Sequence, residues 1–146
     1  MFPTIGNLWS QPANFMNTRT VKIDDYERLI LFWKEHYFVS EMDSRDHFSL
    51  FLEKNSDLSV LIEDDGKIIG TALGSYDGRR GYLQKVVVDK DYRKHGVGKE
   101  LVSEVAKRLK DAGAVFIPIS AEEELTSFYE KCGFVTKDSI SMSLDL

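Results

Sequence analysis

Cationic side chains and closely spaced glycines gather between an apolar run and an amphipathic segment, about two thirds of the way along the chain. Gly96 and Gly98 stand two residues apart, and the basic residues around them are Arg93, Lys94 and Lys99. Glycines let a loop turn tightly, so successive backbone N–H groups can point at one anion. A helix that begins there adds partial positive charge. These residue types and their spacing predict a phosphate-binding loop.

Two well-known phosphate-binding patterns do not fit this loop. A P-loop requires Ser or Thr after Gly-Lys, but Gly98 and Lys99 are followed by Glu100. A dinucleotide-binding fingerprint requires a third glycine where Leu101 stands. Glu100 therefore excludes a P-loop, and Leu101 excludes a dinucleotide-binding fingerprint.

The pattern that fits is Arg-x-x-Gly-x-Gly at Arg93, Gly96 and Gly98, placed after a run of valines. It resembles the coenzyme A signature of the GNAT superfamily of N-acetyltransferases. A second segment at residues 128–134, Phe-Tyr-x-x-x-Gly-Phe, looks like the one that follows in that family. The resemblance covers roughly residues 21–144.

The resemblance implies acetyl-coenzyme A as co-substrate and a role for each segment. Backbone groups of Val86 and Val88 would pair with the pantetheine amides, and the loop would hold the pyrophosphate. The cofactor-binding residues implied are Val86, Val88, Arg93, Lys94, His95, Gly96, Val97, Gly98 and Lys99. Tyr129 corresponds to the tyrosine that protonates the departing thiolate in many members. A phenol with a pKa of about 10 suits a thiolate of broadly similar basicity.

The residues before Tyr129 depart from the family pattern. Glu122 stands where an asparagine is common, and Leu125 where an alanine is common. The general base is not identified: Glu63, Glu122 and Glu123 are candidates by residue type alone. These departures keep a second function open, that of a non-catalytic acyl-coenzyme A-binding module with the same fold.

Three further residues each have a structural interpretation beside a functional one. Tyr129 could serve only in packing, and we expect packing rather than nucleophilic chemistry for Cys132, because no basic partner stands at a useful spacing. The loop at residues 76–81 is either a solvated hairpin tip or a border of the acceptor cleft. In the second case Asp77 would attract an amine, and Tyr76 or Tyr82 would stack on it.

The elements that must position these residues follow from hydrophobic periodicity. Asp24 is expected to cap the first helix, and Asp65-Gly66 predicts a tight hairpin. Hairpins followed by a strand–helix–strand unit indicate an α/β protein of the α+β type, with a mixed central sheet and helices on both faces. That order matches the GNAT-like fold. The predicted strands span 15–21, 59–63, 67–76, 82–88, 114–120 and 140–146, and the predicted helices span 25–37, 45–54, 97–112 and 123–131.

Length and composition limit the number of domains and the classes of partner that we expect. The 146 residues predict one domain over 15–146, preceded by an N-terminal arm over 1–14 that packs on it or on the partner subunit of a homodimer. A net charge of −5 argues against a dedicated nucleic-acid binder, because such binding depends on phosphate neutralisation. Prolines and asparagines interrupt the first 17 residues, so neither a signal peptide nor a membrane helix is expected there.

The cysteine and the histidines bear on compartment and metal content. A single cysteine fits a reducing cytosol, and the three histidines share no ligand spacing with it, so no metal site is predicted. Together with these observations, the resemblance to the GNAT superfamily implies a cytoplasmic N-acetyltransferase with no membrane or nucleic-acid partner. It would transfer an acetyl group directly to a primary amine of a small molecule or a peptide.

Overall fold

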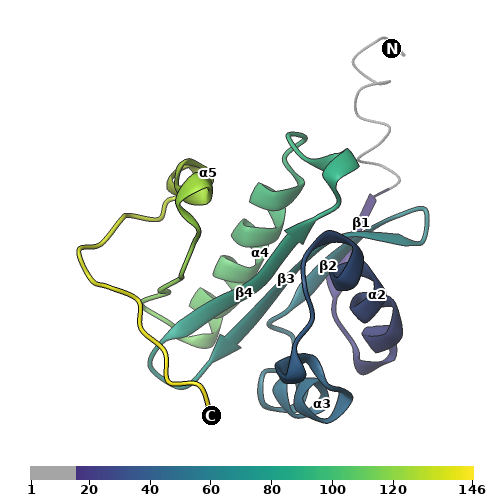
Figure 1. Cartoon of the computed structure of the whole chain (residues 1–146), viewed down its shortest axis with the longest axis horizontal. Helices are drawn as coiled ribbons and strands as arrows, with labels where there is room; N and C mark the ends of the chain where they lie inside the picture. Colours follow the sequence, from purple (N-terminus) through teal and green to yellow (C-terminus); the bar gives the residue numbers. More distant parts are fainter. Residues whose placement is uncertain (1–15) are drawn as a thin grey trace.

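The computed structural model describes residues 16–146, so the expected N-terminal arm lies outside the described residues. A four-stranded sheet lies between two groups of helices (Figure 1). The strands pair in chain order, each antiparallel to the next, which makes the last one an outer strand of the sheet. The strands are β1 (Met16–Thr20), β2 (Val60–Asp64), β3 (Lys67–Tyr76) and β4 (Gly81–Val88).

The helices cover both faces of this sheet. Helix α4 lies on one face, α2 and α3 lie on the other, and α5 lies beyond β4 on the α4 side (Figure 1). The α-helices are α2 (Tyr26–His36), α3 (Arg45–Lys54), α4 (Val97–Ala112) and α5 (Thr126–Lys131). Short 3-10 turns precede or join them at η1 (Ile23–Asp25), η2 (Glu41–Asp43), η3 (Lys90–Tyr92) and η4 (Glu123–Leu125).

Two apolar clusters hold the layers together, one on each face of the sheet. Successive residues of a strand point to opposite faces, so β2 contributes to both clusters. Val60 and Ile62 pack under α4, whereas Leu61 packs with Trp33 of α2 and Phe48 of α3. The helix positions that fill the first cluster are Val97, Leu101, Val102, Val105 and Leu109, all on one stripe of α4.

Several predicted elements are confirmed. The bounds predicted for α3, β3 and α4 agree with the structure, and the hairpin between β2 and β3 turns through Asp65 at φ 52° and Gly66 at φ 82°. Positive φ at both central residues is the requirement of a type I′ turn. Gly113 follows α4 at φ 120°, a conformation open to glycine, and ends the helix there.

The expected cap of the first helix is wrong: Asp25 stands at the N-cap of α2, and its side chain makes no capping hydrogen bond there. Asp24 is exposed, and the buried carboxylate of Asp25 instead accepts a hydrogen bond from the N–H of Lys22 at 2.8 Å. The physical reason is Arg19 on β1, whose guanidinium donates to both oxygens of Asp25, at 2.7 and 3.0 Å. This pair draws Asp25 inward and leaves its neighbour in solvent.

The α+β class is confirmed, but the two strands expected at 114–120 and 140–146 are not formed, so the sheet is antiparallel rather than mixed over residues 16–146. One backbone bond, from Gly81 N–H to the Phe116 carbonyl at 2.9 Å, ties the first segment to β4. The chain then runs away from β4 towards α5 (Figure 1). In the second segment Ile140, Met142 and Leu144 are exposed. Alternation produces a strand only where a neighbouring strand offers bonds and apolar cover.

Candidate functional site

The predicted phosphate loop joins the end of β4 to the start of α4. The chain turns through Lys94 at φ 68° and Gly96 at φ 83°, both in the left-handed region. Backbones that alternate in this way can form concave sites lined by N–H groups. The side chains of Lys94, His95 and Lys99 are exposed, while Val97 is buried and anchors the first turn of α4 in the core.

The N-terminus of α4 fits an anionic ligand. Helix α4 has 16 residues, and Gly96 occupies its N-cap without a side chain to bond the first N–H groups. The N–H groups of Val97, Gly98 and Lys99 have no carbonyl one turn earlier in the helix to accept their hydrogen bonds. The helix dipole adds positive potential at the same place. A phosphate group is the kind of ligand that such an end binds.

Gly98 brings the two predicted signature segments into contact. A Cβ atom at this position would lie 3.0 Å from Cζ of Phe128 on α5 and 3.6 Å from Cγ2 of Val88 on β4. A glycine therefore lets the first turn of α4 approach both the strand and the last helix. The loop, the strand end and the segment that carries Tyr129 meet at this point.

The outer edge of β4 lies beside the loop. The side chains of Val86 and Val88 are half-buried and pack with the α4 cluster, as do Phe128 and Tyr129. Beyond the bond at its first residue, this edge faces no further strand among residues 16–146. An extended amide chain can add to such an edge through main-chain hydrogen bonds. Arg93 reinforces the strand end, because its Nε donates to the Val88 carbonyl at 3.1 Å.

Strand β4 carries a bulge next to these valines. Thr71 of β3 stands opposite Val87, whereas Leu73 stands opposite Gln84, so β4 has one residue more than β3 between these pairs. Lys85, one of the two residues that stand opposite Ala72, has φ 49°. Bulges bend a strand and redirect its N–H groups, and they are common beside active sites.

Tyr129 is half-buried on α5 between two other aromatic rings. Its ring centre lies 4.9 Å from that of Phe128 and 5.6 Å from that of Phe134. Burial raises the pKa of the Tyr129 phenol above its ordinary value of 10.0, and Cys132 and Tyr37 raise it further. The phenol is therefore protonated at neutral pH and can act as a proton donor.

The cysteine and the candidate bases are distinguished by their surroundings. Burial raises the pKa of the Cys132 thiol, which therefore stays protonated rather than becoming a nucleophile. Glu63 on β2 bonds to two arginines, and its pKa is lowered, so it is a poor proton acceptor. Glu122, before α5, is exposed, and a hydrogen bond with Glu124 raises its pKa. Of these two glutamates, Glu122 has the raised pKa and Glu63 the lowered one.

The loop at residues 76–81 has the geometry of a hairpin tip. One oxygen of Asp77 accepts the N–H groups of Arg79 at 2.7 Å and Arg80 at 2.8 Å. These backbone bonds, that from Arg80 first, lower the pKa of Asp77. The carboxylate therefore organises the turn, which supports the structural interpretation of this residue.

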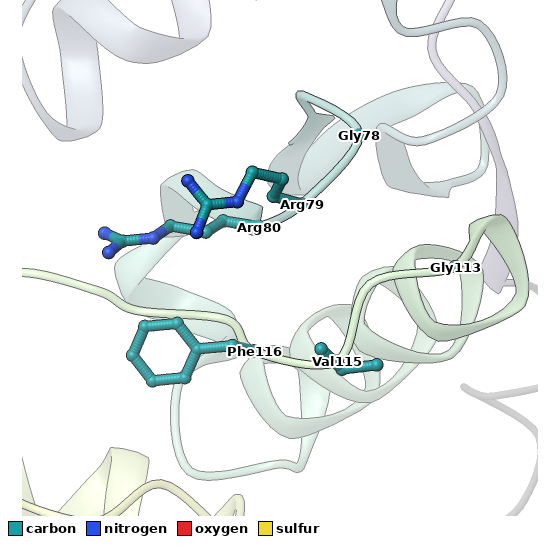
Figure 2. Close-up of a pocket in the computed structure, with 6 residues that line it drawn as sticks. All are labelled: Gly78, Arg79, Arg80, Gly113, Val115 and Phe116. Atoms are coloured by element: carbon teal, nitrogen blue, oxygen red, sulfur yellow. The ribbon is translucent and has the colours of Figure 1, made fainter.

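A surface pocket of about 410 Å³ lies beside this loop, at the end of β4 away from the phosphate loop (Figure 2). The side chains of Arg79 and Arg80 extend on one side of it and Phe116 and Val115 line the other. The Arg80 guanidinium carbon lies 5.5 Å from the centre of the Phe116 ring. The pocket joins the loop to the C-terminal end of α4 at Gly113 and stands apart from Tyr129.

Sequence reasoning missed one group of residues beside the bulge. Lys85 of β4 lies against Trp33 of α2 and the carboxylate of Asp43 in η2. These residues come from three separate segments, so no local pattern joins them. The sequence indicated this group only through Lys85 itself, a charged residue directly before the valines of β4.

Two further properties concern the part of the chain that the structure describes. No group of three or more His, Cys, Asp or Glu side chains there is arranged to hold a metal ion. None of its helices combines the length and the apolar character needed to cross a bilayer.

Known structures share this arrangement of elements. The glucosamine-6-phosphate N-acetyltransferase from Arabidopsis thaliana superposes with a TM-score of 0.69 at 24% identity, covering 89% of this chain and 97% of that one. An aminoglycoside acetyltransferase from a soil metagenomic sample superposes with a TM-score of 0.69 at 18% identity, covering 91% and 97%. At these identities the comparison shows the fold.

Curated relatives extend the likeness to sequence. An acetyltransferase from Yersinia pestis is 30% identical over 131 residues, which is 87% of this chain and 93% of that protein. One from Pectobacterium atrosepticum is 29% identical over the same shares of both chains. The model of the acetyltransferase (GNAT) family matches residues 25–134, a span that holds both signature segments and their contact at Gly98. The chain therefore belongs to the GNAT family and is an acyltransferase.

Proposed function

We propose that this protein transfers the acetyl group of acetyl-coenzyme A directly to a primary amine of a small molecule or a peptide. The contact between Gly98 and Phe128 carries the proposal, because it joins an anion-binding helix end to the helix that holds a protonated tyrosine. The acceptors named for two structural relatives, glucosamine-6-phosphate and aminoglycosides, both bear amino groups.

In this proposal the loop and strand residues hold the co-substrate. The N–H groups of Lys94, Gly96, Val97, Gly98 and Lys99 bind the pyrophosphate, with His95 as a further contact. Arg93 and the two lysines balance its charge. The open edge of β4 at Val86 and Val88 bonds the extended pantetheine arm. The family in general takes acetyl-coenzyme A, whose thioester supplies an activated acyl group.

Transfer then needs one base and one acid from the chain or from water. The acceptor ammonium first loses a proton, with Glu122 or a water as acceptor. The amine nitrogen bonds to the thioester carbon, a backbone N–H beside the bulge stabilises the oxyanion, and the C–S bond breaks. The nitrogen loses its second proton to water as the amide forms. Tyr129 donates a proton to the departing thiolate, so thiol and amide are the products.

Ligand-dependent thermal unfolding tests the binding half of the proposal. Acetyl-coenzyme A, coenzyme A, ATP and NAD are compared at equal concentration, because a ligand at 100 times its Kd adds about 2.7 kcal/mol of stability. A shift with the two coenzyme A species alone is the expected result. An equal shift with ATP would overturn the assignment of the loop.

Turnover on a panel of primary amines, followed as thiol release and as mass gain of the acceptor, tests the chemical half. Direct transfer predicts intersecting initial-rate plots, whereas an acyl-enzyme intermediate produces parallel ones. Coenzyme A binding without turnover on any amine in the panel would favour the non-catalytic module instead.

Assembly and compartment complete the proposal. We propose a cytoplasmic homodimer in which residues 140–146 pack against a second copy. Every second side chain of this segment is apolar and at least 83% exposed: Ile140, Met142, Leu144 and Leu146. A single cysteine is consistent with a reducing compartment.

A further inference from the structure

The ammonium group of Lys85 is enclosed by three aromatic rings and a carboxylate, on the face of the sheet covered by α2 and α3. Its Nζ lies 4.9 Å from the ring centre of Trp33, 5.2 Å from that of Tyr37 and 4.6 Å from that of Phe38. It also lies 3.1 Å from the carboxylate of Asp43 and donates to the Phe38 carbonyl at 2.7 Å. Aromatic faces and an anion are the groups that recognise an alkylammonium ion. We call these four residues the cage.

The inner walls of the cage are held by bonds that do not involve the Lys85 ammonium. Trp33 is fully buried, and its Nε1 donates to Thr71 Oγ1 at 3.0 Å. Thr71 Oγ1 in turn donates to the backbone carbonyl of Lys85 at 2.8 Å. The Asp43 carboxylate is 8% exposed and accepts the Ser40 N–H at 2.9 Å. The two inner walls, Trp33 and Asp43, would therefore keep their positions if the ammonium left the cage.

The outer wall of the cage faces solvent. Tyr37 and Phe38, which follow the end of α2, are 50% and 52% exposed, and their ring centres lie 4.3 Å apart. The Lys85 side chain itself is only 11% exposed. A cation arriving from solvent would meet these two rings first and Lys85 behind them.

The cage also adjoins the proposed reaction centre. Lys85 lies in the bulge immediately before Val86, whose backbone we assign to the pantetheine arm. The side chain of Val86 points into the α4 cluster with Tyr129, whereas the Lys85 ammonium lies over Trp33 in the opposite cluster. The phenol of Tyr37 is also close enough to Tyr129 to raise its pKa. The cage and the acyl-transfer groups therefore flank one short stretch of β4.

We propose that the cage is the binding site for the alkylammonium form of the acceptor, and that Lys85 is its internal occupant, which an incoming primary amine displaces. This inference rests on the proposed acetyl transfer. It specifies the acceptor class as a primary amine on an unbranched alkyl stem, such as a lysine side chain of a peptide. An internal competitor lowers apparent acceptor affinity by the fraction of molecules whose cage is free.

Removal of the Lys85 side chain tests the proposal. Lys85→Gly suits this position, because glycine adopts a φ of 49° without strain. The probe is n-butylammonium chloride, which matches the lysine stem, with n-butanol as a neutral control. Calorimetry is expected to show n-butylammonium binding at least tenfold tighter to Lys85→Gly than to the wild type. n-Butanol is expected to bind neither. Lys85→Asn, which also tolerates left-handed φ, serves if the first variant does not fold.

Two matched variants separate the cage from general effects of charge. Lys107→Ala removes an exposed lysine that pairs with Asp111 on α4, and it should keep wild-type affinity for n-butylammonium. Lys85→Gly combined with Phe38→Ala removes an outer wall and should lose the gain. In turnover assays with n-butylamine, Lys85→Gly should lower KM at least tenfold while the Kd of acetyl-coenzyme A stays unchanged.

The outcomes distinguish this inference from the proposed function. If folded Lys85→Gly binds acetyl-coenzyme A as the wild type does but binds n-butylammonium no tighter, the inference fails. The cage then serves only to hold the Lys85 side chain in place. If neither protein binds acetyl-coenzyme A, the proposed function fails, and the n-butylammonium measurement still reports on the cage by itself.

Discussion

Gly98 of α4 lies so close to Phe128 of α5 that a Cβ atom on the glycine would come within 3.0 Å of the phenyl ring. The end of α4 that we propose binds the pyrophosphate can approach the helix that carries Tyr129 because Gly98 has no side chain. A substitution at Gly98 therefore acts on both parts of the proposed site, the loop before α4 and the helix α5.

Gly98→Asp is expected to weaken binding of acetyl-coenzyme A by at least about 2 kcal/mol, roughly thirtyfold in Kd. The new carboxylate would repel the negatively charged pyrophosphate at the helix end. It would also press on Phe128, and such overpacking lowers the free energy of unfolding by about 1–3 kcal/mol. Calorimetry measures the change. Gly66→Asp in the β2–β3 turn, where a Cβ meets no atom within 4 Å, is the matched control and should bind normally. Unchanged affinity in Gly98→Asp would show that the loop has been misplaced.

Tyr129→Phe is expected to lower kcat by a factor on the order of 10² to 10⁴, the usual contribution of a general acid. The Kd of acetyl-coenzyme A should not change, because the ring and its contacts with Phe128 and Phe134 remain. Tyr82→Phe removes a hydroxyl at the exposed hairpin, 3.5 Å from Asp77, and should retain full kcat. Full turnover by Tyr129→Phe would remove this tyrosine from the mechanism.

Stability should fall in acid through two carboxyl groups held by Arg19. Burial alone would raise the pKa of Asp25, but hydrogen bonds led by that from Arg19 outweigh it and lower the pKa below 3.8. The Arg19 hydrogen bond likewise lowers the pKa of Glu63 below 4.5. Around pH 4 the unfolded chain therefore binds more protons than the folded one. The stabilisation is present above about pH 4.5 and lost as pH falls through the lower folded values.

Arg19→Met tests this assignment. Denaturant unfolding at pH 7 should lose about 1–3 kcal/mol, less than for a fully buried pair because Arg19 is 30% exposed. The variant should also lose much of the stability change between pH 6 and pH 3. Arg45→Met breaks an exposed pair with Glu27 and should cost under about 0.5 kcal/mol. An unaltered acid profile in Arg19→Met would assign the acid sensitivity to other groups.

Replacing both Ile140 and Met142 by serine should leave the free energy of unfolding of a single chain within about 1 kcal/mol, because both side chains are exposed within the chain. Sedimentation of the wild type should report two chains, and that of the variant one chain. Leu31→Ser, at a residue 68% exposed on α2, should remain a dimer. A wild type that sediments as one chain would contradict the proposed homodimer.

Sequence and structure agree where an element carries its own evidence. The apolar stripe of α4 repeats at helical spacing and ends at a glycine, so its bounds were predictable from residues 97–113 alone. The hairpin at Asp65-Gly66 was predictable because its turn depends on two adjacent residues. The loop from Arg93 to Lys99 belongs to the same class, since its spacing and the helix behind it are local in the chain.

The sequence-based predictions fail where the outcome depends on a residue or a strand that is distant in the chain. The alternation at 140–146 predicted a strand, but a strand needs a neighbour to bond with, and no strand among residues 16–146 pairs with this segment. Asp24 does not cap the first helix, because Arg19, on another element, binds the neighbouring Asp25 and draws that carboxylate inward. Neither outcome is visible in a local pattern.

The order of residues alone determined the family and indicated the loop proposed to bind phosphate and the tyrosine proposed as acid, because each depends on residue types at short fixed spacings. Tertiary structure decided how these parts meet: Gly98 against Phe128, and Lys85 within rings from the α2–η2 segment. Those contacts join residues about 30 or more positions apart, and burial and backbone pairing of the whole sheet bring them together. A sequence read along its length holds the parts of this site, and only packing sets the distances between them.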